Sequence, residues 1–256
     1  MIWQFDNTQV YILGSLHFMK EGSINRERHI DAIYNNVQKV VFETSLDPQE
    51  ASICSYESDK LSNNISKSLF RDTKKVWQKY GIEYSKLEKS KIWFAAMLIG
   101  NSINESNGFL FNSGIDKRMW DKSKRDNKEI EWLESKNDLL FYFENAPQDE
   151  QQKFLKQPVR NKTEFLKRMN QLTEVWNDRD EEGFIEIQNK AIEELPELFK
   201  NLIFQRNSNW INKFITTINS ETPTLFVIGA LHCVGEKSVQ NMLLNDYGYT
   251  SKVIAP

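Results

Sequence analysis

Apolar residues along this chain gather in six short runs with the length and composition of β-strands. The first two, at 2–5 and 9–14, flank turn-forming residues at 6–8 and predict a hairpin. The four later runs lie between longer polar stretches, at 39–44, 128–133, 224–228 and 250–254. The runs at 9–14, 39–44 and 224–228 are the most apolar, as expected for strands that are buried in a sheet.

The segments between these runs have helical spacing. Residues 25–37 place Ile30, Ile33 and Val37 on one face, which predicts an amphipathic helix joining two parallel strands. The pattern is helical at about 58–126, and again at 236–245. Residues 135–220 contain no convincing strand. We therefore predict one α/β domain over 1–256, with a small, mostly parallel sheet and a large helical insertion at about 135–220, which would form a lid or wall over the site.

Composition narrows the class of protein. The chain of 256 residues has 27% charged and 39% hydrophobic residues and a net charge of −3, so a nucleic-acid partner is not expected. Two cysteines provide no disulfide framework and no cysteine-based zinc motif. No stretch has the length of a membrane span and no signal peptide is visible, so the expected location is cytoplasmic, or exported if a leader has been removed. The sequence leaves the oligomeric state open.

The four-residue frame Gly-x-x-His occurs twice, at 14–17 and at 229–232, each time at the end of an apolar run. Two of the three histidines, His17 and His232, stand in these frames; the third, His29, is assigned to a helix surface. A glycine at a strand end allows a positive φ and a close approach of the backbone to a ligand. Because histidine binds metals and moves protons near neutral pH, the two frames predict one composite site.

Two carboxylates occupy similar positions, Glu43 and Glu134, each just after a predicted strand. In parallel sheets, ligands bind outside the carboxyl ends of the strands, so both should lie near His17 and His232. Two imidazoles and a carboxylate form a ligand set for a catalytic metal. A metal-free site, with one histidine as general base, a glutamate orienting it and the other histidine stabilising charge, fits the same residues.

Three of these features also have ordinary structural interpretations. Glu134 could cap the helix that begins at Ser135. Arg206 and Trp210 stand four residues apart on one helix face, where the arginine could clamp a substrate or simply pack against the tryptophan. Cys233, which follows His232, is interpreted as a small buried hydrophobic residue rather than as a nucleophile.

Seven short segments, taken in order, cover nearly the whole chain and resemble the TraB/GumN family, which includes Tiki-type proteases and PrgY-like pheromone-shutdown proteins. They are residues 11–17, 40–43, 114–116, 132–134, 206–210, 227–235 and 247–249. This resemblance implies a fold similar to the erythromycin esterase and ChaN group. It also implies a metal-dependent hydrolase, most simply a peptidase, acting on a peptide or small-molecule substrate.

The resemblance further assigns roles to residues. It implies His17, Glu43 and His232 as metal ligands, with Glu43, Asp116, Glu134, Arg206 and Asn207 as catalytic or supporting residues. Manganese or cobalt is the implied metal, with zinc or iron as alternatives. Many members of the family are exported, whereas no leader is visible here, and this difference bears on the substrate rather than on the chemistry. Ser15 stands where threonine is usual in the family, which is a conservative difference.

A rival prediction uses the same cleft without catalysis. The protein would then capture a peptide or haem, and haem would need an exposed histidine or tyrosine beside an apolar pocket. Tyr11 and His17 are the residues that the sequence offers for this role.

Overall fold

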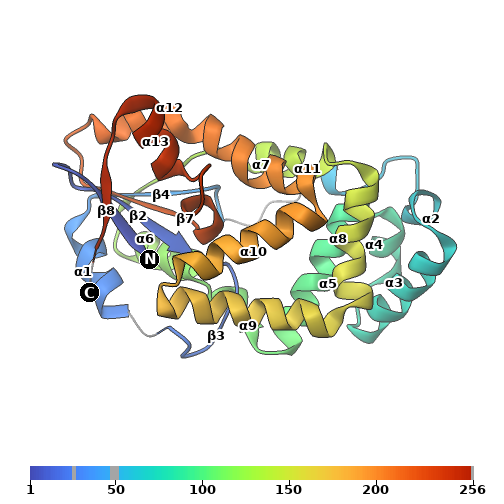
Figure 1. The fold of residues 1–256 in the computed structure, drawn as a ribbon. Coiled ribbons are helices and arrows are strands. Elements are labelled where there is room, and N and C mark those ends of the chain that lie inside the picture. Colours follow the sequence, from blue (N-terminus) through green and yellow to red (C-terminus); the bar gives the residue numbers. More distant parts are fainter. Residues whose placement is uncertain (25–26, 47–51, 255–256) are drawn as a thin grey trace.

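A computed structural model describes residues 1–24, 27–46 and 52–254 (Figure 1). It contains a central six-stranded sheet in the order β6-β4-β7-β2-β1-β8. Its strands are β1 (Ile2–Phe5), β2 (Val10–Ser15), β4 (Lys39–Phe42), β6 (Glu129–Trp132), β7 (Thr224–Gly229) and β8 (Ser251–Val253). Neighbouring strands from β6 to β2 are parallel, whereas β1 pairs antiparallel with both β2 and β8. The prediction of an α/β fold with a mostly parallel sheet is confirmed.

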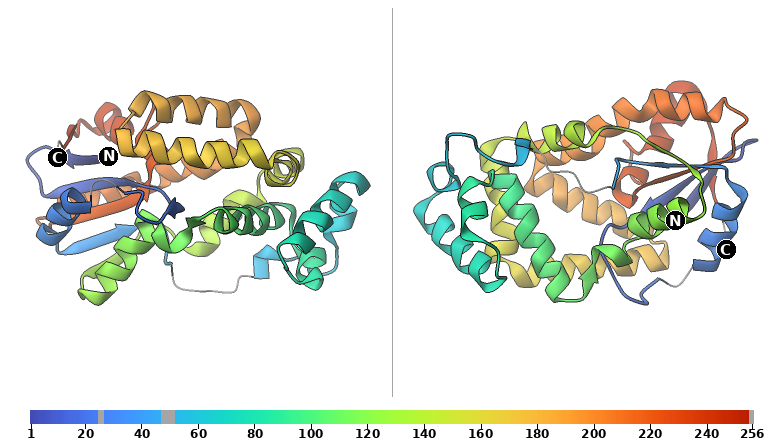
Figure 2. Two further views of the ribbon diagram at one scale, coloured as in Figure 1. Left: turned by 90° about the horizontal axis from the view of Figure 1, so that it is seen from below. Right: turned by 180° about the vertical axis from the view of Figure 1, so that it is seen from behind.

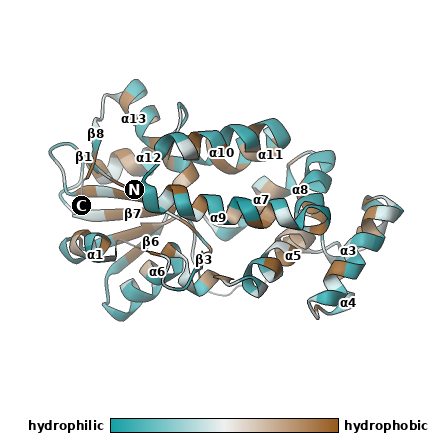
Figure 3. Cartoon of the chain, turned by 60° about the horizontal axis from the view of Figure 1, so that its bottom comes forward, coloured by the Kyte–Doolittle hydropathy of each residue, from teal (hydrophilic) through white to brown (hydrophobic). Residues whose placement is uncertain are grey.

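The central strands are buried because the sheet is covered on both faces. All residues of β7 from Thr224 to Ile228 are buried, and β2 exposes little besides Tyr11. Such near-continuous apolar strands are typical of parallel sheets covered by helices. Figure 3 shows the same distribution, with hydrophobic colour concentrated in the strands and hydrophilic colour on the outer helices.

Helices fill the first two crossovers of the sheet. Between β2 and β4 lies α1 (Glu27–Asn36), shorter than the predicted 25–37, of which residues 25–26 lie outside the described part of the chain. Between β4 and β6 lie α2 (Leu61–Asn64), α3 (Lys67–Lys79), α4 (Tyr84–Lys89), α5 (Ile92–Ser106) and α6 (Ile115–Arg125). A small second sheet pairs β3 (Met19–Lys20) with β5 (Phe109–Leu110). The sequence did not predict it, because strands of two residues carry no periodic signal.

The longest helical segment joins β6 to β7, in the region predicted as an insertion. It contains α7 (Lys136–Glu144), α8 (Gln148–Arg160), α9 (Lys162–Asp178), α10 (Glu181–Glu194), α11 (Pro196–Phe199), a π-helix (Lys200–Gln205) and α12 (Arg206–Ile218). Figures 1 and 2 show α9 and α10 running from the sheet toward the far end of the molecule, where α5 and α8 lie. The last helix, α13 (Val239–Tyr247), precedes β8.

Two main groups of buried side chains stabilise this arrangement. The larger one contains the sheet together with inward residues of α1, α6, α12 and α13. The second is formed by α2 to α5 and α8, away from the sheet. None of the described helices is both long and apolar enough to cross a membrane.

Candidate functional site

The polar residues of interest lie at the carboxyl edge of the four parallel strands. His17 follows β2, Glu43 follows β4, Glu134 follows β6, and His232 follows β7 in a short 3₁₀-helix (Ala230–Cys233). Because β7 lies between β4 and β2, the second Gly-x-x-His frame stands between the first frame and Glu43. The strand order therefore places all four residues along one edge of the sheet, where ligands bind in folds of this class.

The two frame glycines allow close approach rather than an unusual backbone conformation. The Gly229 N–H donates to Glu43 Oε1 at 2.6 Å, and a Cβ at Gly229 would lie 3.2 Å from that oxygen. A Cβ at Gly14 would lie 3.3 Å from the Cα of Ala230. Neither glycine has a positive φ, so that part of the expectation is wrong. The glycines instead bring the two frames and Glu43 together.

A single buried guanidinium, that of Arg206 on α12, links three of these residues. Its Nε donates to Glu134 Oε1 at 2.7 Å, and Nη2 contacts Glu43 Oε2 at 2.5 Å and Glu134 Oε1 at 2.6 Å. Nη1 donates to the Leu202 carbonyl at 3.0 Å and faces His232 Nε2 at 3.1 Å. Arg206 is 4% exposed, and these contacts engage all three nitrogens of its guanidinium.

Asn207 determines which nitrogen of His232 carries the proton. The Asn207 Nδ2 group donates to the carbonyls of Lys237 at 2.8 Å and His232 at 3.3 Å, which orients the amide. Its Oδ1 then lies 2.6 Å from His232 Nδ1 and accepts from it. His232 is therefore a neutral imidazole protonated at Nδ1, and its Nε2 presents a lone pair toward Arg206.

Burial and these contacts push the pKa values of the two carboxylates apart. Burial opposes ionisation of Glu43, but Arg206 and the two frame histidines hold its pKa well below its usual range. Burial raises the pKa of Glu134, although Arg206 opposes that change. Burial also lowers the pKa of His232 to about 3, so the ring is neutral near pH 7. A carboxylate pair separated in this way is typical of sites with distinct acid and base roles.

The first frame forms a second polar group at the start of α6. Ser15 Oγ donates to Asp116 Oδ1 at 2.6 Å, and His17 Nδ1 lies 3.0 Å from Asp116 Oδ2. Asp116 reaches this position because Gly114 packs against the backbone of residues 16–17, where a Cβ would lie 2.1 Å from the His17 carbonyl oxygen. The Asp116 carboxylate raises the pKa of His17, while 53% of the His17 side chain remains exposed.

The helical segment between β6 and β7 anchors the backbone of both frames. Trp176 on α9 donates from Nε1 to the Gly14 carbonyl at 2.7 Å. Gln188 on α10 donates to the carbonyls of Leu231 at 3.1 Å and Val234 at 3.3 Å. These helices therefore support the site directly, rather than only covering it as a lid would.

The structure decides between several of the alternatives left by the sequence. The helix after β6 is capped by Ser135 and Asp138, so Glu134 does not cap it. Cys233 is 2% exposed and its thiol pKa is raised by burial, which confirms the structural interpretation. The third histidine, His29, is half-buried in α1.

Sequence analysis did not assign two further residues of the site. Ser15 orients Asp116, and it gave no signal besides its place in the first frame. Trp210 donates to Glu134 Oε2 at 3.2 Å, and its ring lies 4.7 Å from the Arg206 guanidinium and 4.6 Å from the His232 ring. The four-residue spacing of Arg206 and Trp210 was the available clue to this contact.

The donor chemistry of the frames fits a metal site. Metal-binding histidines usually offer one ring nitrogen to the metal, while the other is held by an oxygen. Here an oxygen faces Nδ1 of both rings, Asp116 Oδ2 at His17 and Asn207 Oδ1 at His232, so a metal would have to be met at Nε2, which at His232 now faces Arg206 Nη1. Within the described residues, no three histidine, cysteine or acidic side chains are grouped so as to hold a metal ion, and Arg206 contacts both Glu43 and His232.

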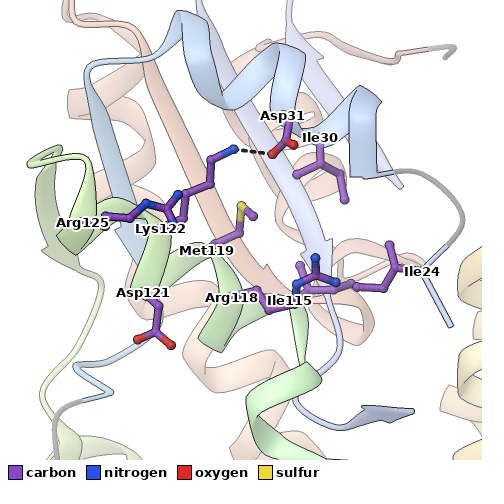
Figure 4. A pocket seen from close by; sticks show the side chains of 9 residues that line it. All are labelled: Ile24, Ile30, Asp31, Ile115, Arg118, Met119, Asp121, Lys122 and Arg125. Atoms are coloured by element: carbon purple, nitrogen blue, oxygen red, sulfur yellow. Dashed lines mark hydrogen bonds and ion pairs between the residues drawn. The ribbon is translucent and has the colours of Figure 1, made fainter. Parts of the chain in front are cut away.

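A pocket of about 360 Å³ lies between α1 and α6, and Asp116 is not among the residues that line it (Figure 4). Ile30, Ile115 and Met119 provide its apolar surface, and Lys122 at its wall forms an ion pair with Asp31. A second wall residue, Asp121, pairs with Lys117. The pocket thus lies apart from the strand-end residues, and we do not include it in the candidate site.

Comparison with known proteins gives one match. The sequence model of the TraB/PrgY/gumN family matches residues 2–252, essentially the whole chain. No curated protein and no solved structure matches the chain.

Proposed function

The chain belongs to the TraB/PrgY/gumN family, and from this premise we propose that it is a metal-dependent hydrolase, specifically a peptidase. Its site would consist of the two Gly-x-x-His frames and the carboxylates after β4 and β6. The observation that carries the proposal is the matched support of the two imidazoles, each of which has an oxygen facing its Nδ1. The choice of peptides rests on the likeness to Tiki-type proteases.

We assign the metal-binding role to His17, Glu43 and His232. Glu43 is ionised and His232 is neutral near pH 7, which are the forms that bind a metal. Asp116, in contrast, raises the pKa of His17 to about 9, so a metal at His17 would have to displace a proton. Manganese or cobalt is proposed, with zinc or iron as alternatives. When bound, such an ion would supply a Lewis acid and lower the pKa of a bound water toward neutrality.

The remaining residues have roles that follow from their contacts. Burial raises the pKa of Glu134, which suits its carboxylate to take and return a proton. Asp116 and Asn207 orient the two imidazoles. Arg206 holds both carboxylates, and it can offer an N–H to a substrate oxygen only by giving up one of its present partners.

Metal analysis of wild-type protein beside His17→Ala and His232→Ala tests the site. His29→Ala is the matched control, because His29 lies on α1 and outside the strand-end cluster. We expect about one metal ion per chain in wild type and control, loss in both frame variants, and chelator-sensitive cleavage of a peptide library. No metal in wild type after incubation with manganese, cobalt and zinc would refute metal dependence.

The same experiment includes the non-catalytic alternative. About half of the His17 side chain is exposed, 53%, so a ligand can reach it without catalysis. Metal-loaded protein that binds peptides but cleaves none would indicate capture. A Soret band on haem titration, absent in His17→Ala, would indicate haem binding.

A further inference from the structure

The Arg206 guanidinium contacts two of the proposed metal ligands. Nη2 lies 2.5 Å from Glu43 Oε2, and Nη1 lies 3.1 Å from His232 Nε2. The imidazole nitrogen and the other Glu43 oxygen, Oε1, are 3.8 Å apart. A carboxylate oxygen and a nitrogen lone pair therefore already face a cation, which is part of the protein itself.

Arg206 has a second set of contacts that does not involve the proposed ligands. Nε and Nη2 both reach Glu134 Oε1, at 2.7 and 2.6 Å, and Nη1 also donates to the Leu202 carbonyl. The ring of Trp210 lies beside the guanidinium and donates to the other oxygen of Glu134. The guanidinium can thus release Glu43 and His232 while Glu134 still neutralises its charge.

We propose that Arg206 is a resident cation that competes with the divalent ion for Glu43 and His232, and that Glu134 retains the guanidinium when the ion binds. This inference rests on the proposed function, because it treats Glu43 and His232 as metal ligands. Charge supports the exchange: two carboxylates and one guanidinium leave one net negative charge in a buried site. Binding of a divalent ion changes the sign of this net charge but not its magnitude, provided that the ion pair between Arg206 and Glu134 remains.

The competing interpretation predicts the opposite effect on metal affinity. If Arg206 only holds the ligands in place, its removal should weaken metal binding, because preorganisation is lost. If Arg206 competes with the ion, its removal should strengthen metal binding. The sign of the change in affinity therefore distinguishes the two.

Calorimetric titration with Mn²⁺, Co²⁺ and Zn²⁺ would measure this sign in wild type, in Arg206→Lys, and in the double variant Arg206→Gln/Glu134→Gln. The double variant removes one charge of each sign, so the net charge of the site is unchanged. Arg168→Gln/Glu194→Gln is the matched control, since this ion pair joins α9 to α10 outside the candidate site. We expect the double variant to bind metal at least about tenfold more tightly than wild type. Arg206→Lys should bind metal more tightly than wild type by a smaller factor, and the control should bind metal with the affinity of wild type.

Each outcome supports or overturns the inference. If the double variant binds metal no more tightly than wild type, the inference is overturned. Metal binding by wild type would in that case still support the proposed function. Binding by the double variant but not by wild type supports the inference and refutes metal dependence of the native protein. No binding by any protein overturns both.

A measurement on wild type keeps the inference testable if the variants do not fold. In NMR spectra of the protein with saturating metal, we expect the Nη signals of Arg206 to shift as they lose His232 and Glu43. The Nε–H signal should persist, because its bond to Glu134 remains. Unchanged Nη signals at full metal occupancy would overturn the inference.

Discussion

Replacement of Arg206 by glutamine would leave two buried carboxylates without the cation between them. Glu43 Oε2 and Glu134 Oε1 contact the same nitrogen of Arg206, at 2.5 and 2.6 Å, so they lie within about 5 Å of each other. At an effective dielectric constant of about 20, two like charges at that distance repel by about 3 kcal/mol. Including the uncompensated burial, we expect Arg206→Gln to lower the free energy of unfolding at pH 7 by about 3–5 kcal/mol.

The variant should also change the pH dependence of stability. In wild type, the folded pKa of Glu43 lies below its ordinary value of 4.5, so its contribution is present above that pH and is lost as pH falls. Burial raises the pKa of Glu134, so folded wild type already loses some stability as pH rises above 4.5. Without Arg206, repulsion between the two carboxylates adds to burial and raises the pKa of the pair further. The folded variant then binds a proton that the unfolded chain does not, and it gains stability as pH falls from 7 toward 5.

Urea denaturation at pH 5, 6 and 7 measures this effect. Relative to wild type, the deficit of Arg206→Gln should shrink at pH 5, and Arg206→Gln/Glu134→Gln should be more stable at pH 7 than the single variant. Arg168→Gln, which removes a partly exposed arginine, should show neither effect. Suppose that the losses of stability from Arg206→Gln and Glu134→Gln simply add in the double variant, and that the deficit of Arg206→Gln is the same at all three pH values. Arg206 would then not act as the counter-charge of both carboxylates.

Three further predictions concern the first frame and its supports. Gly114→Ala places a methyl group 2.1 Å from a backbone oxygen, and it should lower the free energy of unfolding by about 3 kcal/mol or more, measured by thermal or urea denaturation. Gly100→Ala in α5 is the control: its methyl group would meet Phe165 at 3.4 Å, so this variant should be neutral or stabilising. Trp176→Phe removes a buried donor 2.7 Å from its carbonyl acceptor and should cost about 1–3 kcal/mol; a loss near zero would contradict its anchoring role. Asp116→Asn should lower the pKa of His17 from about 9 toward 6.5 in an NMR titration. In wild type this pair contributes stability that is present below pH 6.5 and lost as pH rises toward 9, and an unchanged titration would contradict the pairing.

The strands of the central sheet were predictable because their signal is local. The six predicted runs correspond to its six strands, although the edge strands β6 and β8 are partly exposed and contain charged residues. The predicted hairpin is confirmed by the antiparallel pairing of β1 with β2. A buried strand must be apolar over its own few residues, so its sequence shows where it begins and ends. The pairing of β3 with β5 was missed, because two-residue strands are defined by their partners rather than by their composition.

The strand-end positions of Glu43, Glu134 and the frame histidines were also readable from the sequence. Each follows an apolar run within a few residues, and parallel strands bring such positions to one edge. The roles of individual side chains were not readable in the same way. Sequence spacing left Glu134 as a helix cap or a site residue, and it left Arg206 as a substrate clamp or a packing residue.

The sequence by itself therefore determined the strands, the α/β class and the residues that end the strands. Tertiary structure alone decided that β7, late in the chain, lies between β4 and β2, and that Arg206 pairs with Glu43, 163 residues away. It also decided that Asn207 fixes the proton of His232. The physical reason is that strand formation depends on neighbouring residues, whereas hydrogen-bond partners and pKa values depend on which distant segments share a buried, water-poor space.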